Sequence, residues 1–184
     1  MRSGLSGLVF ISAAVLCQAT VSIAAQQPDQ HGSKLSLRSL RNAHYNIEDV
    51  EDGVTLRNGK FKSEDDLPLF VSLDKPIAFG DLDGDGDEDA VVVLVENAGG
   101  TGFWRTLAAV RNDGGVPVHI ASFGFGDRDV VKSLKIVSGR IHLAALVHGP
   151  DDALCCPSQP VTAVLRLHGK HLEMVSCKGC PSPP

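Results

Sequence analysis

The chain has 184 residues and a formal net charge of −5, with 17 Lys and Arg against 22 Asp and Glu. It contains no basic cluster, which argues against nucleic acid and anionic membrane surfaces as partners. With 43% hydrophobic residues, it is long enough and apolar enough to build one domain with its own core.

The N-terminus has the features of a secretory signal peptide. Arg2 precedes a short apolar stretch, and small residues end at Ala24 and Ala25, where cleavage is expected. The stretch is too short to span a bilayer, and we expect no membrane span elsewhere. Cys17 superficially resembles a lipoprotein cysteine, but Leu16 is too large for the position before it. The sequence therefore predicts an exported protein, periplasmic or extracellular, without a lipid anchor at Cys17.

The sequence as a whole predicts four segments. Residues 1–25 form the signal peptide, and residues 26–40 form a linker and a short N-terminal segment. Leucines at 35, 37 and 40 fit one short helix over Leu35–Arg41 better than an extended segment. Residues 41–176 are predicted to form a β domain, and residues 177–184 a tail rich in Cys and Pro.

Alternating apolar residues around turn sequences predict a series of β-hairpins. The first joins Val54–Arg57 to Lys60–Ser63 around Asn58-Gly59, a dipeptide that suits a type I′ turn. Later turns are expected at Gly99–Gly102, Asn112–Gly115, Ser138-Gly139 and His168-Gly169. This spacing predicts a mainly β fold: a single antiparallel domain of meander hairpins, closed as a sandwich or an open barrel.

The segment Asp81–Asp89 carries the strongest functional signal, because its nine residues hold six of the 22 acidic side chains. Carboxylates alternate along it, and Gly84 and Gly86 permit the tight turns that such a loop needs. Ca²⁺ prefers about six to eight oxygen ligands, which a short acidic loop can supply. The expected ligands are the side chains of Asp81, Asp83 and Asp85, the backbone carbonyl of Asp87, and Asp89 closing the shell.

The spacing excludes an EF-hand, whose loop ends in Glu at the twelfth position and continues as a helix. Counted from Asp81, the twelfth position is Val92, inside the apolar run Ala90–Val95. This run is rich in β-branched residues and does not alternate, so it predicts a strand buried on both faces. We expect a second sheet to cover one face and Leu35–Arg41 or a loop to cover the other. The site is thus a strand–loop–strand site that begins at the strand Ile77–Gly80.

The pattern Phe-Gly-Asp-x-Asp-x-Asp-Gly-x-x-Asp, which runs from Phe79 to Asp89, resembles the calcium loop of integrin-type FG-GAP repeats. Propeller blades repeat, whereas this loop occurs once, so a full propeller is not expected. The chain is also similar to a group of small exported bacterial proteins through the segments Gly80–Ala90, Gly99–Phe103 and Cys155–Gln159. That resemblance implies a β fold, export and calcium, and it implies no activity.

Four cysteines follow the signal peptide: Cys155, Cys156, Cys177 and Cys180. An even number in an exported chain predicts disulfides. A vicinal Cys155–Cys156 bond would be strained, so we expect two bridges that join the first two cysteines to the last two, in either of two pairings. Zinc binding is the alternative, and export disfavours it. A redox Cys-x-x-C site is not expected, because the chain after Cys180 is rich in Pro and not helical.

No motif of a nucleophilic enzyme or metalloprotease accompanies these features. The sequence therefore predicts a non-catalytic, calcium-stabilised β domain with a structural or binding role at the cell envelope and an unknown protein or glycan partner. Phe103 and Trp104 would point to opposite faces of a strand, so one of them is expected to be exposed for binding. The alternative is a periplasmic enzyme or inhibitor with a site near His148, Asp151 and Asp152, in which calcium is structural.

Overall fold

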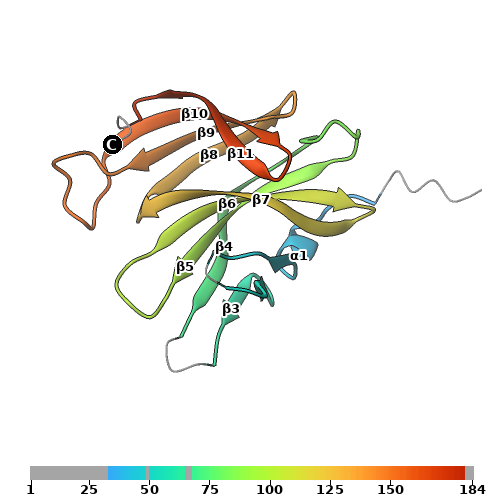
Figure 1. The fold of residues 1–184 in the computed structure, drawn as a ribbon, viewed down its shortest axis with the longest axis horizontal. Coiled ribbons are helices and arrows are strands. Elements are labelled where there is room, and N and C mark those ends of the chain that lie inside the picture. Colours follow the sequence, from blue (N-terminus) through green and yellow to red (C-terminus); the bar gives the residue numbers. More distant parts are fainter. Residues whose placement is uncertain (1–32, 49, 65–67, 181–184) are drawn as a thin grey trace, which may run out of the picture.

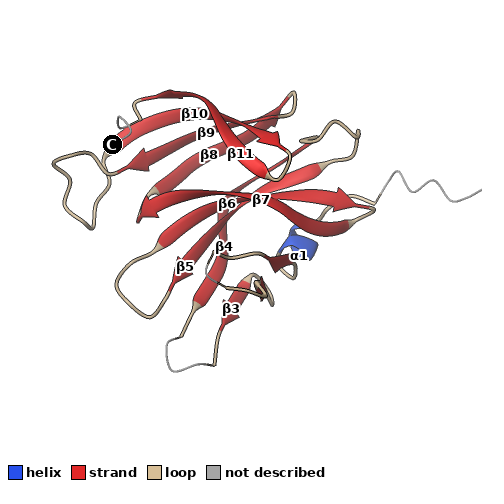
Figure 2. Cartoon of the chain, in the orientation of Figure 1, coloured by secondary structure: helices blue, strands red, loops and turns tan. Residues whose placement is uncertain are grey.

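The computed structural model describes residues 33–48, 50–64 and 68–180. The predicted signal peptide with Cys17, residues 26–32 of the predicted linker and residues 181–184 of the predicted tail therefore lie outside the described residues. The described chain consists of strands and one short helix, α1 (Leu37–Leu40) (Figure 2). Two antiparallel sheets pack face to face, and the N-terminal segment forms a third layer against the larger sheet (Figure 1). The predicted mainly β class is confirmed, and the described residues form no closed propeller.

Both sheets are meanders, in which each strand pairs with its neighbours along the chain. The larger sheet contains β3 (Lys60–Lys62), β4 (Phe70–Gly80), β5 (Asp89–Asn97), β6 (Trp104–Asp113) and β7 (Val116–Asp127). The smaller sheet contains β8 (Val130–Val137), β9 (Arg140–Val147), β10 (Gln159–His168) and β11 (His171–Lys178). The turns predicted between β5 and β6, between β6 and β7, between β8 and β9, and between β10 and β11 are confirmed. Strand β11 includes Cys177, so the strand extends two residues beyond the predicted end of the β domain.

The first predicted hairpin is wrong beyond its turn. Asn58 and Gly59 have φ of 54° and 83°, as a type I′ turn requires. Across this turn, however, the only pairing is an isolated bridge between Arg57 and Lys60. Strand β2 (Val54–Thr55) pairs instead with β1 (His44–Tyr45), and β3 pairs with β4. In this arrangement β3 joins the five-stranded sheet and Val54 of β2 is buried beneath that sheet, which a separate β2–β3 hairpin would not provide.

Strand β5 is buried on both faces, as its lack of alternation predicted. Val91 and Val93 pack in the core between the two sheets. Val92 and Leu94 pack in a second core, where Leu40 of α1 covers the opposite face of the larger sheet. The predicted cover by the N-terminal leucine segment is therefore confirmed. Burial of a Val or Leu side chain contributes about 1.5–3 kcal/mol, so both cores depend on this strand.

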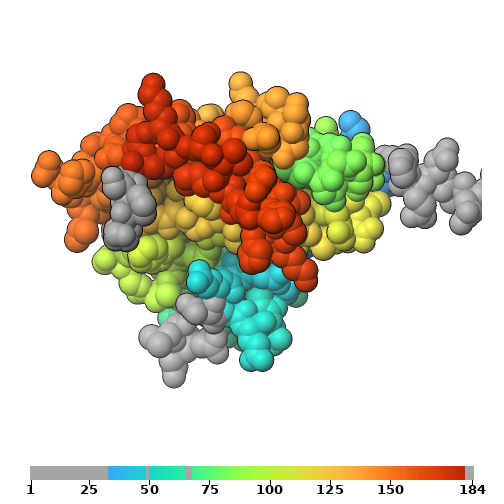
Figure 3. All heavy atoms as spheres, turned by 45° about the horizontal axis from the view of Figure 1, so that its top comes forward, coloured from blue at the N-terminus to red at the C-terminus, as the bar shows by residue number. Residues whose placement is uncertain are grey.

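The chain passes from the larger sheet to the smaller one between β7 and β8, through Arg128 and Asp129. Arg128 has φ of 59°, and its guanidinium donates to the carbonyl of Leu154 at 3.2 Å and also to Asp127 and the carbonyl of Thr101. The sheets also meet where β4 packs against β8 and β7 packs against β11. Figure 3 shows the smaller sheet, coloured orange to red, lying over the green and yellow strands.

Candidate functional sites

The acidic loop joins β4 to β5, with Gly80 paired to Asp89 at its base, so the predicted strand–loop–strand arrangement is confirmed. Carboxylate oxygens of Asp81, Asp83 and Asp89 lie within 4.8 Å of one another. Metal–oxygen distances for a hard cation such as Ca²⁺ are about 2.3–2.6 Å, so two oxygens of one shell can lie up to about 5 Å apart. These three carboxylates can therefore hold one metal ion.

Asp85 and Asp87 stand outside this group of three carboxylates. Asp85 Oδ1 accepts the backbone N–H of Asp87 at 2.8 Å, and Asp83 Oδ1 accepts the N–H of Asp85 at 3.2 Å. These bonds to the backbone two residues ahead are Asx turns, which shape the loop. Of the five expected ligands, the structure brings three side chains together. The side chain of Asp85 is not among them, and the expected donor of Asp87 is a backbone carbonyl.

Two glycines allow the loop to wrap around one carboxylate. Gly84 and Gly86 have φ of 85° and 90°, in the region that residues with a Cβ rarely adopt. Their N–H groups donate to the two carboxylate oxygens of Asp81, at 2.6 Å and 3.2 Å. The conformation of the backbone therefore fixes the position of Asp81 beside the other two carboxylates.

Asp89 has no exposed surface and connects the loop to two strands. Its Oδ2 accepts the N–H of Leu82 at 2.9 Å, and its Oδ1 accepts the N–H of Asn112, on β6, at 2.8 Å. Burial raises the pKa of Asp89, the two backbone N–H groups oppose that rise, and Asp83 and Asp85 add to it. A bound cation would favour the ionised form of this carboxylate.

The second predicted site, near His148, is largely a turn. Asp152 Oδ2 accepts the N–H groups of Gly149 and Ser158 at 2.8 Å and 2.7 Å, and its Oδ1 accepts the Ser158 hydroxyl at 2.6 Å. Hydrogen bonds from the Ser158 side chain and from these backbone groups lower the pKa of Asp152. Asp151 is exposed. Asp152 therefore holds the loop through Gly149 and Ser158, and its hydrogen bonds within the described chain do not include His148.

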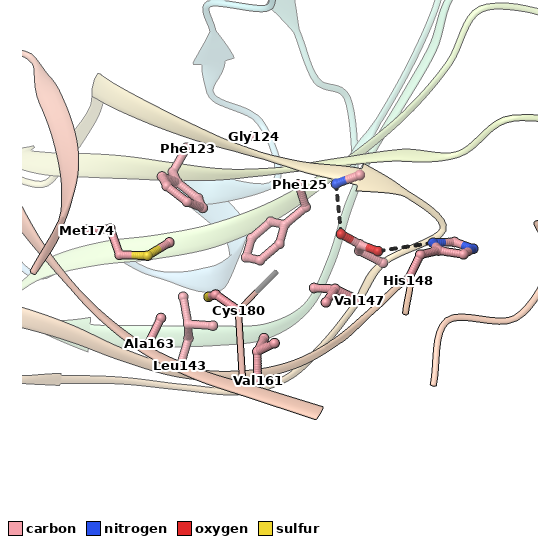
Figure 4. Close-up of a pocket in the computed structure, with 12 residues that line it drawn as sticks. Phe123, Gly124, Phe125, Leu143, Val147, His148, Val161, Ala163, Met174 and Cys180 are labelled. Atoms are coloured by element: carbon pink, nitrogen blue, oxygen red, sulfur yellow. Dashed lines mark hydrogen bonds and ion pairs between the residues drawn. The ribbon is translucent and has the colours of Figure 1, made fainter. Parts of the chain in front are cut away.

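His148 instead lines a cavity that the sequence did not predict (Figure 4). The cavity has a volume of about 300 Å³ and lies between the two sheets, where residues of β7, β9, β10 and β11 form its walls. Asp129, in the switch between the sheets, places a carboxylate beside His148. In the sequence Asp129 only precedes an apolar strand, a position typical of turn residues, so no local pattern distinguishes it.

The cysteines form two disulfides, Cys155–Cys156 and Cys177–Cys180. All four cysteines are therefore bridged, as predicted, but the expected bridges between the two segments are wrong. Cys177 lies in β11 opposite Ala163 of β10, which places it within the smaller sheet. Cys155 and Cys156 lie in the exposed loop before β10, and each pair closes within its own segment. Disulfides are typical of proteins that fold in an oxidising compartment.

Phe103 and Trp104 are both exposed, at 46% and 53% of their surface, although only one was expected to be. Trp104 begins β6, whereas Phe103 lies before the strand, so strand alternation does not apply to the pair. Trp104 also lines an open pocket together with Glu96 and Arg105. Burial raises the pKa of Glu96, and a hydrogen bond from Thr106 opposes that rise.

Comparison of the chain with models of known protein families, with curated proteins and with solved structures finds no match. Over the described ranges, no helix combines the length and the apolar character needed to cross a membrane.

Proposed function

We propose that the protein is an exported, non-catalytic β domain in which Ca²⁺ closes the Asp81–Asp89 loop. The observation that carries this proposal is the approach of the Asp81, Asp83 and Asp89 oxygens to within 4.8 Å. All the donors are hard carboxylate oxygens on a glycine-containing loop. Such a set suits Ca²⁺, which accepts irregular shells, better than Mg²⁺, which demands a near-octahedral arrangement.

Asp81, Asp83 and Asp89 would hold the ion, and Asp85 and the carbonyl of Asp87 are the further donors that the loop offers. The ion would offset the repulsion among the carboxylates and would hold the ends of β4 and β5 together. Because the loop forms with these strands, the free energy of calcium binding adds to the free energy of folding. The FG-GAP-like spacing and the similarity to small exported bacterial proteins support the same proposal.

The role that we propose is structural or binding, at the cell envelope. Export is supported by the pattern of the N-terminal sequence and by the two disulfides. A binding role is supported by two neighbouring aromatic side chains that remain exposed, Phe103 and Trp104. Trp104 also lines the pocket that contains Glu96 and Arg105. Exposed aromatic side chains next to polar groups suit a protein or glycan partner.

The test is a calcium titration followed by calorimetry and thermal unfolding, with excess chelator as the reference state. We expect a dissociation constant in or below the range of about 10⁻⁴–10⁻³ M, and stabilisation of about 2.7 kcal/mol at a hundredfold excess over that constant. Asp83→Ala should abolish the effect. Glu88→Ala, which removes a neighbouring carboxylate that is not an expected ligand, should retain it. Absence of both heat and stabilisation at millimolar calcium would contradict the proposal.

A further inference from the structure

We propose that the cavity between the two sheets binds a small apolar amine, whose ammonium group contacts the carboxylate of Asp129. This site is separate from the acidic loop, because the lining residues of the cavity include none of the loop residues. The proposal depends on three features: the apolar walls, the buried carboxylate at one end, and the unsatisfied oxygen of that carboxylate.

The walls of the cavity are apolar and come from both sheets. Phe123 and Phe125 of β7 form one side. The centroids of their rings are 5.5 Å apart, and the ring planes are close to perpendicular, at 78°. The facing side is formed by Leu143, Val161 and Ala163 of β9 and β10 (Figure 4). A volume of about 300 Å³ is at the small end of the range of about 300–1,000 Å³ for ligand pockets, so the body of the ligand is a short alkyl or single aryl group.

The carboxylate of Asp129 is buried without full compensation. The residue is only 5% exposed, and its Oδ2 accepts the N–H of Gly126 at 2.8 Å. Its Oδ1 is buried and has no hydrogen-bond donor among the described residues. His148 Nδ1 lies within ion-pair distance of this oxygen, at 3.4 Å. The carbonyl of Leu154 lies 3.2 Å from His148 Nε2 and accepts a hydrogen bond from it, so a neutral His148 has no proton on Nδ1 to donate to Asp129. A buried acceptor without a donor is destabilising, so the site favours a ligand that supplies one.

The charge of the site selects the head group of the ligand. Of the described residues that line the cavity, only Asp129 and His148 are ionisable, and none is lysine or arginine. An ammonium group would give Asp129 both an opposite charge and a hydrogen bond, and charge-assisted bonds are about twice as strong as neutral ones. A carboxylate ligand would instead bring a second negative charge beside the first. An alcohol would satisfy the oxygen without neutralising its charge.

The cavity is accessible from solvent through side chains that are partly exposed. Met174 of β11 lines it and is 45% exposed, and the side chain of His148 is 27% exposed. A small ligand can therefore enter without separation of the sheets. Met174 has a flexible, polarisable side chain that can adapt to different apolar groups.

The experiment compares hexylamine, hexanol and hexanoate as probes by calorimetry at pH 8, where an alkylamine carries its proton. We expect hexylamine to bind at least about tenfold more tightly than hexanol, because both probes can donate a hydrogen bond to Asp129 but only the ammonium also brings an opposite charge to the buried carboxylate. Hexanoate should bind least. Equal affinity for the amine and the alcohol, or preference for the carboxylate, would overturn the proposal.

Two variants test which residues are responsible. Asp129→Asn should reduce hexylamine affinity by at least about tenfold and leave hexanol affinity nearly unchanged. Ala163→Leu should fill the cavity and abolish binding of both probes, whereas Thr162→Leu, on the exposed face of the same strand, should retain it. If Asp129→Asn does not fold, Ala163→Leu still decides the location of the site. Unchanged hexylamine binding in Ala163→Leu would refute it.

A third variant separates this site from the proposed calcium loop. Asp83→Ala should eliminate calcium stabilisation and leave hexylamine affinity within about twofold, because Asp83 does not line the cavity. In the wild-type protein, hexylamine binding without calcium stabilisation would contradict the calcium proposal alone, and calcium stabilisation without hexylamine binding would contradict the amine proposal alone.

Discussion

The buried carboxylate of Asp89 accepts the backbone N–H of Asn112 at 2.8 Å, which connects the acidic loop to β6. Asn112 in turn accepts the N–H of Gly115 at 2.7 Å and donates through Nδ2 to the carbonyl of Ser33 at 3.0 Å. The backbone and side chain of Asn112 therefore connect the acidic loop, the β6–β7 turn and Ser33, the first described residue of the chain. This arrangement gives Asp89 a structural role that does not depend on metal.

We expect Asp89→Ala to destabilise the protein even in excess chelator. The substitution leaves the buried N–H groups of Leu82 and Asn112 without acceptors, each at about 1–3 kcal/mol, so the free energy of unfolding should fall by about 2–6 kcal/mol. Asp83→Ala, whose carboxylate is exposed, should have little effect in chelator and should lose the calcium increment. Urea denaturation with chelator and with calcium measures both. Equal stability of the two variants in chelator would contradict this division of roles.

Leu94→Ala tests the burial of β5. Leu94 is fully buried in the second core, and truncation of such a side chain costs about 2–5 kcal/mol. The apparent calcium affinity should also fall, because loop and strand form together. Leu37→Ala is the matched control, since Leu37 is 46% exposed and its truncation should cost less than about 1 kcal/mol. Denaturant unfolding that gives Leu94→Ala wild-type stability would show that β5 is not a central strand.

Stability should fall as the pH decreases below the ordinary pKa of His119, which is 6.5. Burial lowers the pKa of His119, so the unfolded chain binds a proton that the folded chain does not, and stability rises with pH across this window. Its Nδ1 accepts the N–H of Asn46 at 2.9 Å, and protonation would remove that acceptor. The melting temperature should decrease from pH 7 to pH 5 and should do so less in His119→Gln. His171→Gln, at an exposed histidine, should keep the slope.

Tryptic peptides of the non-reduced protein should reveal the disulfide pairing. Cleavage after Arg140, Arg166, Lys170 and Lys178 separates Cys155 and Cys156 from Cys177 and Cys180. We expect the peptide 141–166 to carry an internal bridge and to remain unlinked, while the peptide with Cys177 stays joined to the one with Cys180. Mass spectrometry before and after reduction distinguishes these species. A link between peptide 141–166 and either C-terminal cysteine would contradict the pairing, and four labelled thiols would contradict both disulfides.

The features that the sequence predicted correctly are those encoded by residues close together along the chain. The meander turns, the double-sided burial of Val91–Leu94 and the loop around Asp81 all follow from local spacing. The predicted strand partner of Val54 and the predicted disulfide partner of Cys155 are wrong. Each pairing depends on segments from elsewhere in the chain that pack against these residues. Asp129 was missed for the same reason: its importance comes from His148 and from apolar walls to which four strands contribute.

The N-terminal segment with α1, which covers the second core, affects how the chain reaches its native state. Leu35, Leu40 and Tyr45 precede every strand of the larger sheet, yet the surface that buries them exists only after β4, β5 and β6 have paired. This segment is synthesised before those strands but can dock only after they have paired. Contacts so distant in sequence slow folding. Until docking occurs, the bare face around Val92 and Leu94 is an apolar surface on which two copies of the chain can associate, so self-association should compete with folding at high concentration.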